Sequence, residues 1–435
     1  VFNPTQALSN YLINGVYFKT YAGSKQLPAI PVSRYLSAEF FNIIDEESEW
    51  ENVIKKPTEN CRLDVDLDFR GYTMDQIFVN AQFKGVLDGA GHTISNVEYD
   101  PAAYKNIYKS ANQYYTGLFK EVDGKVRDLT LDNVNFEGGG YAGALAGYAN
   151  GALITDVYVK NSYVAGQNKV GGLFGFATYS DIDSCGVSNT KVVSVGGEYS
   201  NYSYAPEPAT GGFIGFIDVA NNITRCYANE VYVEAFGKDI DAFGVGGFVG
   251  TLWSGGNYLD GIYATGIVNS NAFASGGLLG YTYNSFTINN AYEDVDVTSY
   301  WQQAGGLVGV VNSAPSCTTL LAFGDVMSGI ILPEDNDTDK PNTTFVMNSN
   351  NAAITNYLYF DQSKLRANST IARDAAKSFS SDLISSEAIY NYLSSDYFTI
   401  DEKAEEGILP KLILKDGTLM PNQIDVNVGG GPVDS

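Results

Sequence analysis

Short apolar segments framed by glycine recur along the middle of this chain, with polar turn residues between them. A Gly-Gly-apolar-apolar-Gly pentad stands at five places: Gly171–Gly175, Gly211–Gly215, Gly246–Gly250, Gly276–Gly280 and Gly305–Gly309. The repeating unit is about 29 residues long, which is typical of units that bury their apolar face only by stacking on neighbours. The pattern therefore predicts a solenoid.

A second apolar element follows each pentad at a matching distance. Its first position is apolar in every copy: Leu129, Val157, Cys185, Cys226, Ile262, Ala291 and Leu320. Both elements are short, rich in Val, Ile, Leu and Tyr, and bounded by Gly, Asn, Asp and Ser, which is typical of strands between turns. The sequence predicts an all-β fold, a right-handed parallel β-helix with rungs about 4.8 Å apart, in which those seven residues form one row facing the core. The pentad glycines either adopt positive φ at the corners or allow close backbone approach.

The run from Phe83 to Val97, the Gly117-Leu118-Phe119 segment and the later pentads resemble the GLUG-repeat β-helix proteins, over roughly residues 61 to 330. Such repeats occur in large secreted or surface-anchored bacterial proteins, including adhesin-like proteins of gut bacteria and the non-catalytic region of IgA-specific metallopeptidases. The resemblance therefore implies an extracellular or cell-surface location in a bacterium. In all these proteins the repeat is a scaffold, so the resemblance implies a fold rather than a reaction.

The flanks of the repeat predict three parts. Residues 1–60 are expected to form an N-terminal segment and cap, 61–330 a β-helix of about seven rungs, and 331–435 a C-terminal cap with a linker-like tail. Helix-compatible stretches at 37–44 and 381–393 are expected to cover the end rungs, whose unpaired edges would invite aggregation.

Net charge limits the class of partner. The chain has 50 acidic and 26 basic residues, which gives a formal net charge of −24. Such a surface repels phosphate backbones and anionic membranes, so we expect neither nucleic-acid binding nor membrane insertion. The expected partner is a glycan or a host protein, bound by a monomeric module of a larger multi-domain protein.

The sequence predicts no cofactor and no bound metal. A zinc-peptidase H-E-x-x-H motif needs two histidines, and the chain has only His92, for which we expect a structural hydrogen bond. The run 335–339 imitates the start of a calcium-binding loop, but Lys340 replaces its turn glycine, so Ca²⁺ is considered there and not predicted. Cys185 and Cys226 are expected to form a buried stack of free thiols.

Two aspartates keep an enzymatic alternative open. Asp183 and Asp260 fall at equivalent positions two rungs apart, with Thr224 between them. Two rungs correspond to about 9.6 Å, near the upper end of the separation in an inverting glycosidase pair. A polysaccharide-degrading β-helix enzyme and a non-binding structural stalk are therefore the alternatives to a binding module.

Two aromatic features predict where a ligand binds. The first is a row of tyrosines at the second position of the aligned strand: Tyr158, Tyr227, Tyr263 and Tyr292. Alternation places this row on the outer face, where it either stacks against sugar rings or stabilises the solenoid without a ligand.

The second feature is a pair of insertions, residues 193–210 and 234–244, which lengthen two consecutive coils just before their pentads. Both insertions should leave the solenoid at the same corner and build one rim, since loops on a rigid scaffold commonly carry recognition. The predicted ligand-binding residues are Tyr199, Tyr202, Tyr204, Phe236, Asp239, Asp241, Tyr227 and Tyr263.

Overall fold

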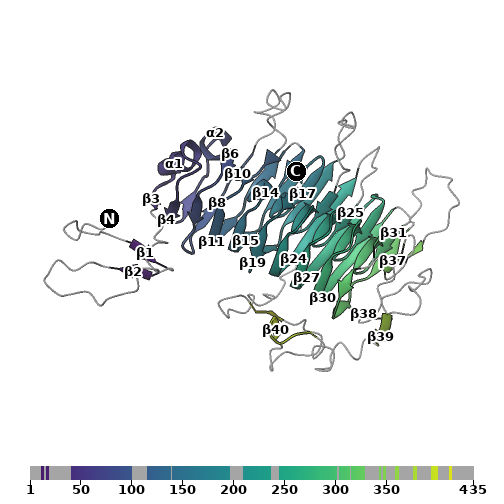
Figure 1. Ribbon diagram of the computed structural model, residues 1–435. Coiled ribbons are helices and arrows are strands. Elements are labelled where there is room, and N and C mark those ends of the chain that lie inside the picture. Colours follow the sequence, from purple (N-terminus) through teal and green to yellow (C-terminus); the bar gives the residue numbers. More distant parts are fainter. Residues whose placement is uncertain are drawn as a thin grey trace, which may run out of the picture.

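In the computed structural model, the described residues are 11–13, 16–18, 41–99, 115–138, 140–195, 209–236, 244–300, 303–313, 315–328, 342–343, 346–348, 358–361, 376–379, 393–399 and 411–413. Most of them form coil after coil of parallel strands, stacked into an elongated solenoid (Figure 1). Strands β1 (Tyr11–Ile13) and β2 (Val16–Phe18) form a separate antiparallel pair. The predicted all-β parallel β-helix is confirmed, while its handedness stays a prediction.

Three parallel sheets run along the solenoid. Sheet 1 holds the short strands that precede the pentads: β9 (Tyr115–Thr116), β13 (Tyr141–Ala142), β17 (Lys169–Gly171), β22 (Ala209–Gly211), β25 (Gly244–Gly246), β28 (Ala274–Gly276), β31 (Gln303–Gly305) and β36 (Asn342–Thr343). Sheet 2 holds the strands that follow the pentads: β6 (Val79–Phe83), β10 (Phe119–Val122), β14 (Ala146–Asn150), β18 (Phe174–Thr178), β23 (Ile214–Ile217), β26 (Val249–Leu252), β29 (Leu279–Thr282), β32 (Val308–Val311) and β37 (Val346–Asn348).

Sheet 3 forms the rest of each coil, and its longest strands lie in the middle of the solenoid: β24 (Asn222–Phe236), β27 (Tyr258–Ser270) and β30 (Thr287–Ser299). The first long strand replaces three shorter ones in the preceding coil, so β24 pairs in turn with β19 (Asp181–Asp183), β20 (Gly186–Ser188) and β21 (Lys191–Val195). Strand β27 then pairs with β24, and β30 with β27. The other strands of sheet 3 are β3 (Asn42–Ile44), β4 (Cys61–Leu63), β5 (Leu67–Asp68), β7 (Val86–Asp88), β8 (Thr93–Ser95), β11 (Lys125–Asp132), β12 (Asn135–Glu137), β15 (Leu153–Lys160), β16 (Tyr163–Gly166), β33 (Ser316–Cys317), β34 (Leu320–Ala322), β35 (Val326–Ser328), β38 (Leu358–Asp361) and β39 (Ala376–Phe379).

The pentad glycines bring sheets 1 and 2 into backbone contact. A Cβ added at Gly211 would lie 2.1 Å from the Ile214 oxygen, and one at Gly215 would lie 2.6 Å from the Val170 nitrogen. No glycine of the four pentads within residues 171–280 has a positive φ. Of the two roles that the sequence allowed, these glycines therefore serve close approach.

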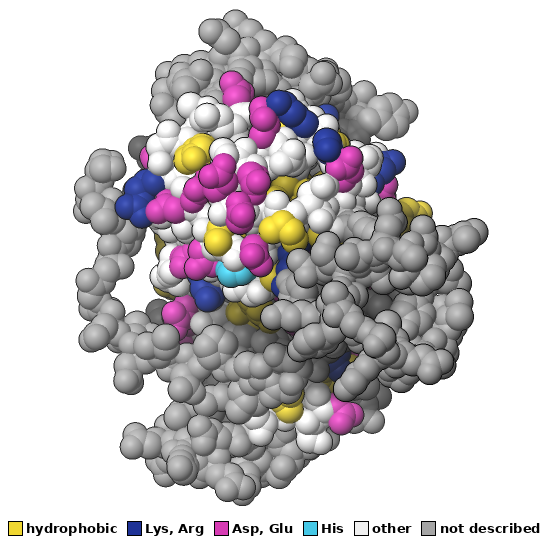
Figure 2. Space-filling model, turned by 90° about the vertical axis from the view of Figure 1, so that its left-hand side faces the viewer, with side chains coloured by type: hydrophobic (Ala, Val, Ile, Leu, Met, Phe, Trp, Pro, Cys, Tyr) yellow, Lys and Arg dark blue, Asp and Glu magenta, His cyan; other side chains and the backbone are white. Residues whose placement is uncertain are grey.

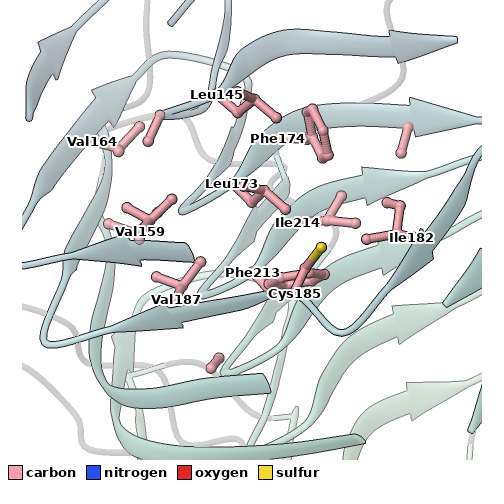
Figure 3. Close-up of a cluster of buried hydrophobic side chains, with 14 of the residues drawn as sticks. Leu145, Val159, Val164, Leu173, Phe174, Ile182, Cys185, Val187, Phe213 and Ile214 are labelled. Atoms are coloured by element: carbon pink, nitrogen blue, oxygen red, sulfur yellow. The ribbon is translucent and has the colours of Figure 1, made fainter. Parts of the chain in front are cut away.

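The predicted core row is confirmed. Its seven members, from Leu129 to Leu320, are each at most 1% exposed. They pair in register along the axis, as Leu129 does with Val157 and Cys226 with Ile262. Figure 3 shows part of the surrounding core. There the Phe213 ring also stacks on the Phe248 ring of the next coil, with centroids 4.7 Å apart.

The cysteine prediction is confirmed as well. Cys185 and Cys226 are fully buried and not disulfide-bonded. Each Sγ donates to a main-chain oxygen two residues earlier, Cys185 to Asp183 at 3.2 Å and Cys226 to Thr224 at 3.1 Å. Burial raises the pKa of the Cys226 thiol well above its usual range, so this thiol stays protonated.

Asparagines hold one corner of successive coils in a left-handed backbone conformation. The φ values are +57° at Asn96, +53° at Asn133, +50° at Asn161 and +44° at Asn189. Asn133 Nδ2 donates to Asn96 Oδ1 and Asn189 Nδ2 to Asn161 Oδ1, both at 2.7 Å. Asparagine tolerates this conformation because its short side chain can hydrogen-bond locally.

Short helices cover the first coil: η2 (Glu47–Trp50), α1 (Glu51–Lys55) and α2 (Met74–Ile77). Trp50 is fully buried, and its indole Nε1 donates to the Ile77 oxygen at 2.8 Å. Figure 2 shows that Asp and Glu side chains gather on this end of the molecule. His92 lies there too, with Nδ1 3.2 Å from Asp66 Oδ1, which agrees with the expected structural role.

The predicted part boundaries need correction at both ends. Residues 42–44, assigned to a helical cap, form strand β3, which pairs with β4. Parallel pairing also continues beyond residue 330, through β36 to β39, so the β-helix is longer than the range 61–330. The expected C-terminal helix at 381–393 lies outside the described residues except for its last residue.

One core position carries a carboxyl group. Glu293 is fully buried in a column whose neighbours are Ala264 and Ala322. Its Oε2 accepts from the Val295 N–H at 2.8 Å, and a Cβ at Gly277 would lie 2.7 Å from the same oxygen. Burial, with smaller contributions from the nearby acidic residues that follow it, raises the pKa of Glu293 to about 8.

A carboxyl group whose pKa rises on folding stabilises the fold below its unfolded pKa and loses that contribution as pH rises to its folded pKa. We therefore expect the free energy of unfolding to fall between pH 5 and pH 8 by on the order of 4 kcal/mol because of Glu293. Glu293→Gln should remove this fall and leave the variant more stable than the parent at pH 8. Denaturant unfolding at both pH values tests this, with exposed Asp181→Asn as the control. An unchanged pH dependence in Glu293→Gln would contradict the expectation.

Candidate functional site

The two insertions do leave the solenoid at one corner. Strands β21 and β24, which lead into them, pair with Ser194 opposite Ala235, and the strands that follow pair with Ala209 opposite Gly244. The predicted residues Tyr199, Tyr202, Tyr204, Asp239 and Asp241 lie outside the described residues.

The one described side chain of that predicted set within the insertions is Phe236, at the end of β24. It is half-buried, and its ring lies 5.6 Å from that of Tyr300 at an interplanar angle of 59°. Phe236 is thus packed against the solenoid beside the corner.

The tyrosine row stacks as its alignment predicts. The ring centroids of Tyr227 and Tyr263 are 5.6 Å apart, and those of Tyr263 and Tyr292 are 4.9 Å apart at an interplanar angle of 3°. Exposure of the row was predicted wrongly, because Tyr227 is 2% and Tyr263 5% exposed. Both rings lie outside the coil but under another part of the chain.

The cover is a C-terminal strap, residues 393–399 and 411–413, which contains the antiparallel pair β40 (Phe398–Thr399) and β41 (Lys411–Leu412). Figure 1 draws β40 beneath the ends of the long strands of sheet 3. Leu393, Phe398 and Leu412 of the strap are buried in one cluster with the tyrosines. The Phe398 ring lies 5.5 Å from that of Tyr292.

Polar contacts also hold the strap, and one of its rings occupies space that a glycine leaves open. The Ser394 N–H donates to Asn290 Oδ1 at 3.1 Å, and the Arg225 guanidinium lies 5.1 Å from the centre of the Tyr397 ring. A Cβ at Gly261, whose φ is +63°, would lie 2.3 Å from Tyr397 Cδ1. Tyr397 therefore occupies the space that glycine leaves open.

The two aspartates of the enzymatic alternative lie in one row, and both have structural partners. Asp183 accepts from Thr224 Oγ1 at 2.8 Å and pairs with Arg225 at 3.2 Å. Asp260 is 5% exposed and accepts from Tyr258 Oη at 2.5 Å and from Asn290 Nδ2 at 2.8 Å.

The strap lies against this row as well. Burial, and secondarily the Asp260 carboxylate, raises the pKa of Tyr397 to about 12. The carboxylates of Asp183 and Asp260 thus lie at the contact between strap and solenoid. Through their hydrogen-bond and ion-pair partners they help to hold the strap in place.

A second aromatic surface lies on the outer side of the coils where sheets 1 and 2 meet, and the sequence analysis missed it. Its rings contact one another in a continuous series, and we call them the outer aromatic face: Tyr115, Tyr141, Tyr148, Phe176, Phe216, Trp253, Phe273, Tyr281 and Tyr283. Four of them directly follow the last glycine of a pentad, or in one case of the looser copy Gly143–Gly147: Tyr148, Phe176, Phe216 and Tyr281. That regular position is the signal by which the sequence could have found them.

Lys169 lies within this face. Its side chain is 1% exposed, and Nζ lies 4.2 Å from the ring centre of Phe216, 4.6 Å from that of Tyr141 and 4.7 Å from that of Phe176. Burial lowers the pKa of Lys169 to about 7, and the carboxylate of Asp218 opposes the shift. The rings also favour the ammonium form.

Two other features, a metal-ion cluster and a membrane-spanning helix, are not found in the described part of the chain. No group of three or more His, Cys, Asp or Glu side chains there is arranged to hold a metal ion. None of the helices in those residues has the length and apolar character that crossing a membrane requires.

Comparison with known proteins gives distant relatives. No family model matches the chain, so the GLUG-repeat resemblance is not confirmed. The chain is 27% identical to halomucin from Haloquadratum walsbyi over 296 residues, a match that covers 54% of this chain and 3% of halomucin. This chain therefore corresponds to a small fraction of that relative's length.

Two solved structures are similar in outline. A candidate immunoglobulin A1 protease from Bacteroides ovatus is 17% identical with a TM-score of 0.46, and the likeness covers 83% of this chain and 90% of that one. An IgA1 protease is 18% identical with a TM-score of 0.46, covering 66% of this chain and 21% of that one. Both scores lie below 0.5, so the architecture rests on the strand pairings of this chain.

Gly261→Ala should displace the strap, because the new methyl group takes the space of the Tyr397 ring. We expect protease cleavage within the strap to accelerate at least about tenfold, since the lost contact is worth more than about 1.4 kcal/mol. Gly91→Ala is the control: its φ is +83° and no heavy atom would lie within 4 Å of the new Cβ, so it adds backbone strain alone. Equal cleavage of the strap in both variants would show that Tyr397 does not hold it.

Proposed function

We propose that this solenoid is a binding module of a secreted or cell-surface protein, adhesin-like in function, with a glycan or a host protein as its partner. The rigid stack of coils supplies the scaffold, and recognition belongs to the corner of the insertions 193–210 and 234–244 together with the outer aromatic face. Similarity to part of halomucin supports a role as one portion of a much longer protein.

One observation carries this proposal: the second insertion returns to the solenoid directly beside the outer aromatic face. Gly244, its last residue, begins β25, and a Cβ there would lie 2.6 Å from the Tyr281 nitrogen and 2.8 Å from Thr251 Oγ1. The last residue of the second insertion and Tyr281, whose ring belongs to the outer aromatic face, thus adjoin one another. Aromatic rings provide a large contact area at low conformational-entropy cost.

The tyrosine row is not part of the proposed surface, because the strap covers Tyr227 and Tyr263. The enzymatic alternative is less well supported, because Asp183 and Asp260 are engaged by Thr224, Arg225 and other neighbours. A structural stalk remains the alternative that the experiment below must separate from binding.

The test is a screen of the whole chain against glycan and host-protein arrays, repeated after deletion of residues 198–207. We expect the deletion to abolish or strongly weaken the binding found. The free energy of unfolding of the deletion variant should differ from that of the parent by less than about 1 kcal/mol, because loop-closure entropy depends only slowly on loop length.

The outcomes separate the three functions. Absence of any array partner would favour a stalk and contradict the proposal, and so would binding that is unaffected by the deletion and by Tyr283→Ala on the exposed part of the face. Polysaccharide hydrolysis that Asp183→Asn abolishes would instead establish an enzyme.

A further inference from the structure

A groove crosses three successive coils at the corner where sheet 2 turns into sheet 3. It is lined by residues 256–258, 285–287 and 315–316, which follow strands β26, β29 and β32. Its volume is about 600 Å³. Sites for small molecules commonly enclose about 300–1,000 Å³, so the groove is large enough for a ligand of that size.

The strand register explains why the groove exists. Tyr258 pairs with Thr287, and Thr287 pairs with Ser316, so successive coils place a large ring and then two short side chains at one outward position. Tyr258 is 38% exposed. Its hydroxyl group donates to Asp260 Oδ2 at 2.5 Å, which restrains the ring. Tyr258 therefore forms one wall of the groove, and the short side chains leave the space beside it.

The chemistry of the lining favours an uncharged ligand. None of the described residues that line the groove is charged. Ser285, Thr287 and Ser316 offer hydroxyl groups, each of which can donate and accept a hydrogen bond. The Asp260 carboxylate, which Tyr258 contacts, is only 5% exposed. An ionic ligand would lose hydration in the groove without gaining a partner of opposite charge.

The groove begins close to the outer aromatic face. Ser285 lines the groove, and Tyr283 of that face lies two residues earlier and is 39% exposed. Asn284 Nδ2 donates to the Trp253 oxygen at 3.0 Å, and a Cβ at Gly255 would lie 3.5 Å from the Ser285 oxygen, so the turns of the two coils are packed together. The Cα atoms of Tyr283 and Ser285 are at most about 7 Å apart, so a ligand longer than the groove can extend onto the face.

The lining matches the surface of a sugar, which presents C–H groups on the ring faces and hydroxyl groups around the edge. The first suit the negative face of an aromatic ring, and the second suit short hydroxyl side chains. We infer that this groove binds a neutral oligosaccharide, with one sugar ring stacked on Tyr258 and its hydroxyl groups bonded to Ser285 and Thr287. This inference rests on the proposed binding function, commits it to a glycan and adds a site outside the insertions. The net charge of −24 agrees with a neutral glycan, because that charge repels acidic ones.

The test is titration calorimetry of the whole chain with the neutral probes maltotriose, cellotriose and tri-N-acetylchitotriose, and with trigalacturonic acid as the acidic probe. We expect at least one neutral probe to bind. Tyr258→Ala removes the stacking ring and Ser285→Leu fills the groove, so each should weaken that binding by about tenfold. Tyr258→Phe keeps the ring and should stay within about threefold of the parent.

Tyr179→Ala is the matched control. Tyr179 is 60% exposed in the corresponding turn of an earlier coil, after β18, and does not line the groove. Its loss should change affinity by less than about twofold, because it removes an exposed ring without altering the groove. Far-ultraviolet circular dichroism of each variant identifies any loss of folding.

Failure of every neutral probe to bind would overturn the inference, and so would tighter binding of trigalacturonic acid. Equal losses in Tyr258→Ala and Tyr179→Ala would show that the sugar binds outside the groove. Equal losses in Tyr258→Ala and Tyr258→Phe would show that the ring does not stack on the sugar. If no neutral probe binds while deletion of residues 198–207 removes an array partner, the inference fails and the proposed binding function stands.

Discussion

The backbone contact between sheets 1 and 2 is the constraint on which the rest of the coil depends. Because Gly215 lies against the main chain of β17, no side chain can enter the contact from either sheet. Side chains beside it, such as Lys169 and Phe176, are displaced outward into a common row. The same glycines that close the coil therefore produce the outer aromatic face.

The two aromatic rows of the solenoid have different uses. On sheet 3 the tyrosines are buried by the strap, and their stacking energy goes into holding the chain together. Where sheets 1 and 2 meet, part of the other row stays accessible, as at Tyr283 and Phe273. The tyrosine row and the outer aromatic face both consist of aromatic residues at repeating positions. The first is an internal contact, and the second is a candidate recognition surface.

The sequence predicted what repeats at short range. The core row from Leu129 to Leu320 and the adjacent free thiols of Cys185 and Cys226 follow from alternation and period alone. The strap could not be predicted, because its contact between Ser394 and Asn290 joins residues 104 positions apart and leaves no local pattern. The cap at 42–44 was misassigned because pairing with β4 outweighed helix propensity there. Lys169 gave no signal, since its burial arises where two sheets meet.

The strap changes how the solenoid can come apart. A stack of coils in which each unit contacts only its neighbours can lose its last units one at a time. Here a C-terminal segment reaches back to β27 and β30, through Gly261 and Tyr292. Opening the distal coils while the strap stays bound would leave a closed loop, so the strap acts as a latch that makes the central coils and the C-terminus unfold together.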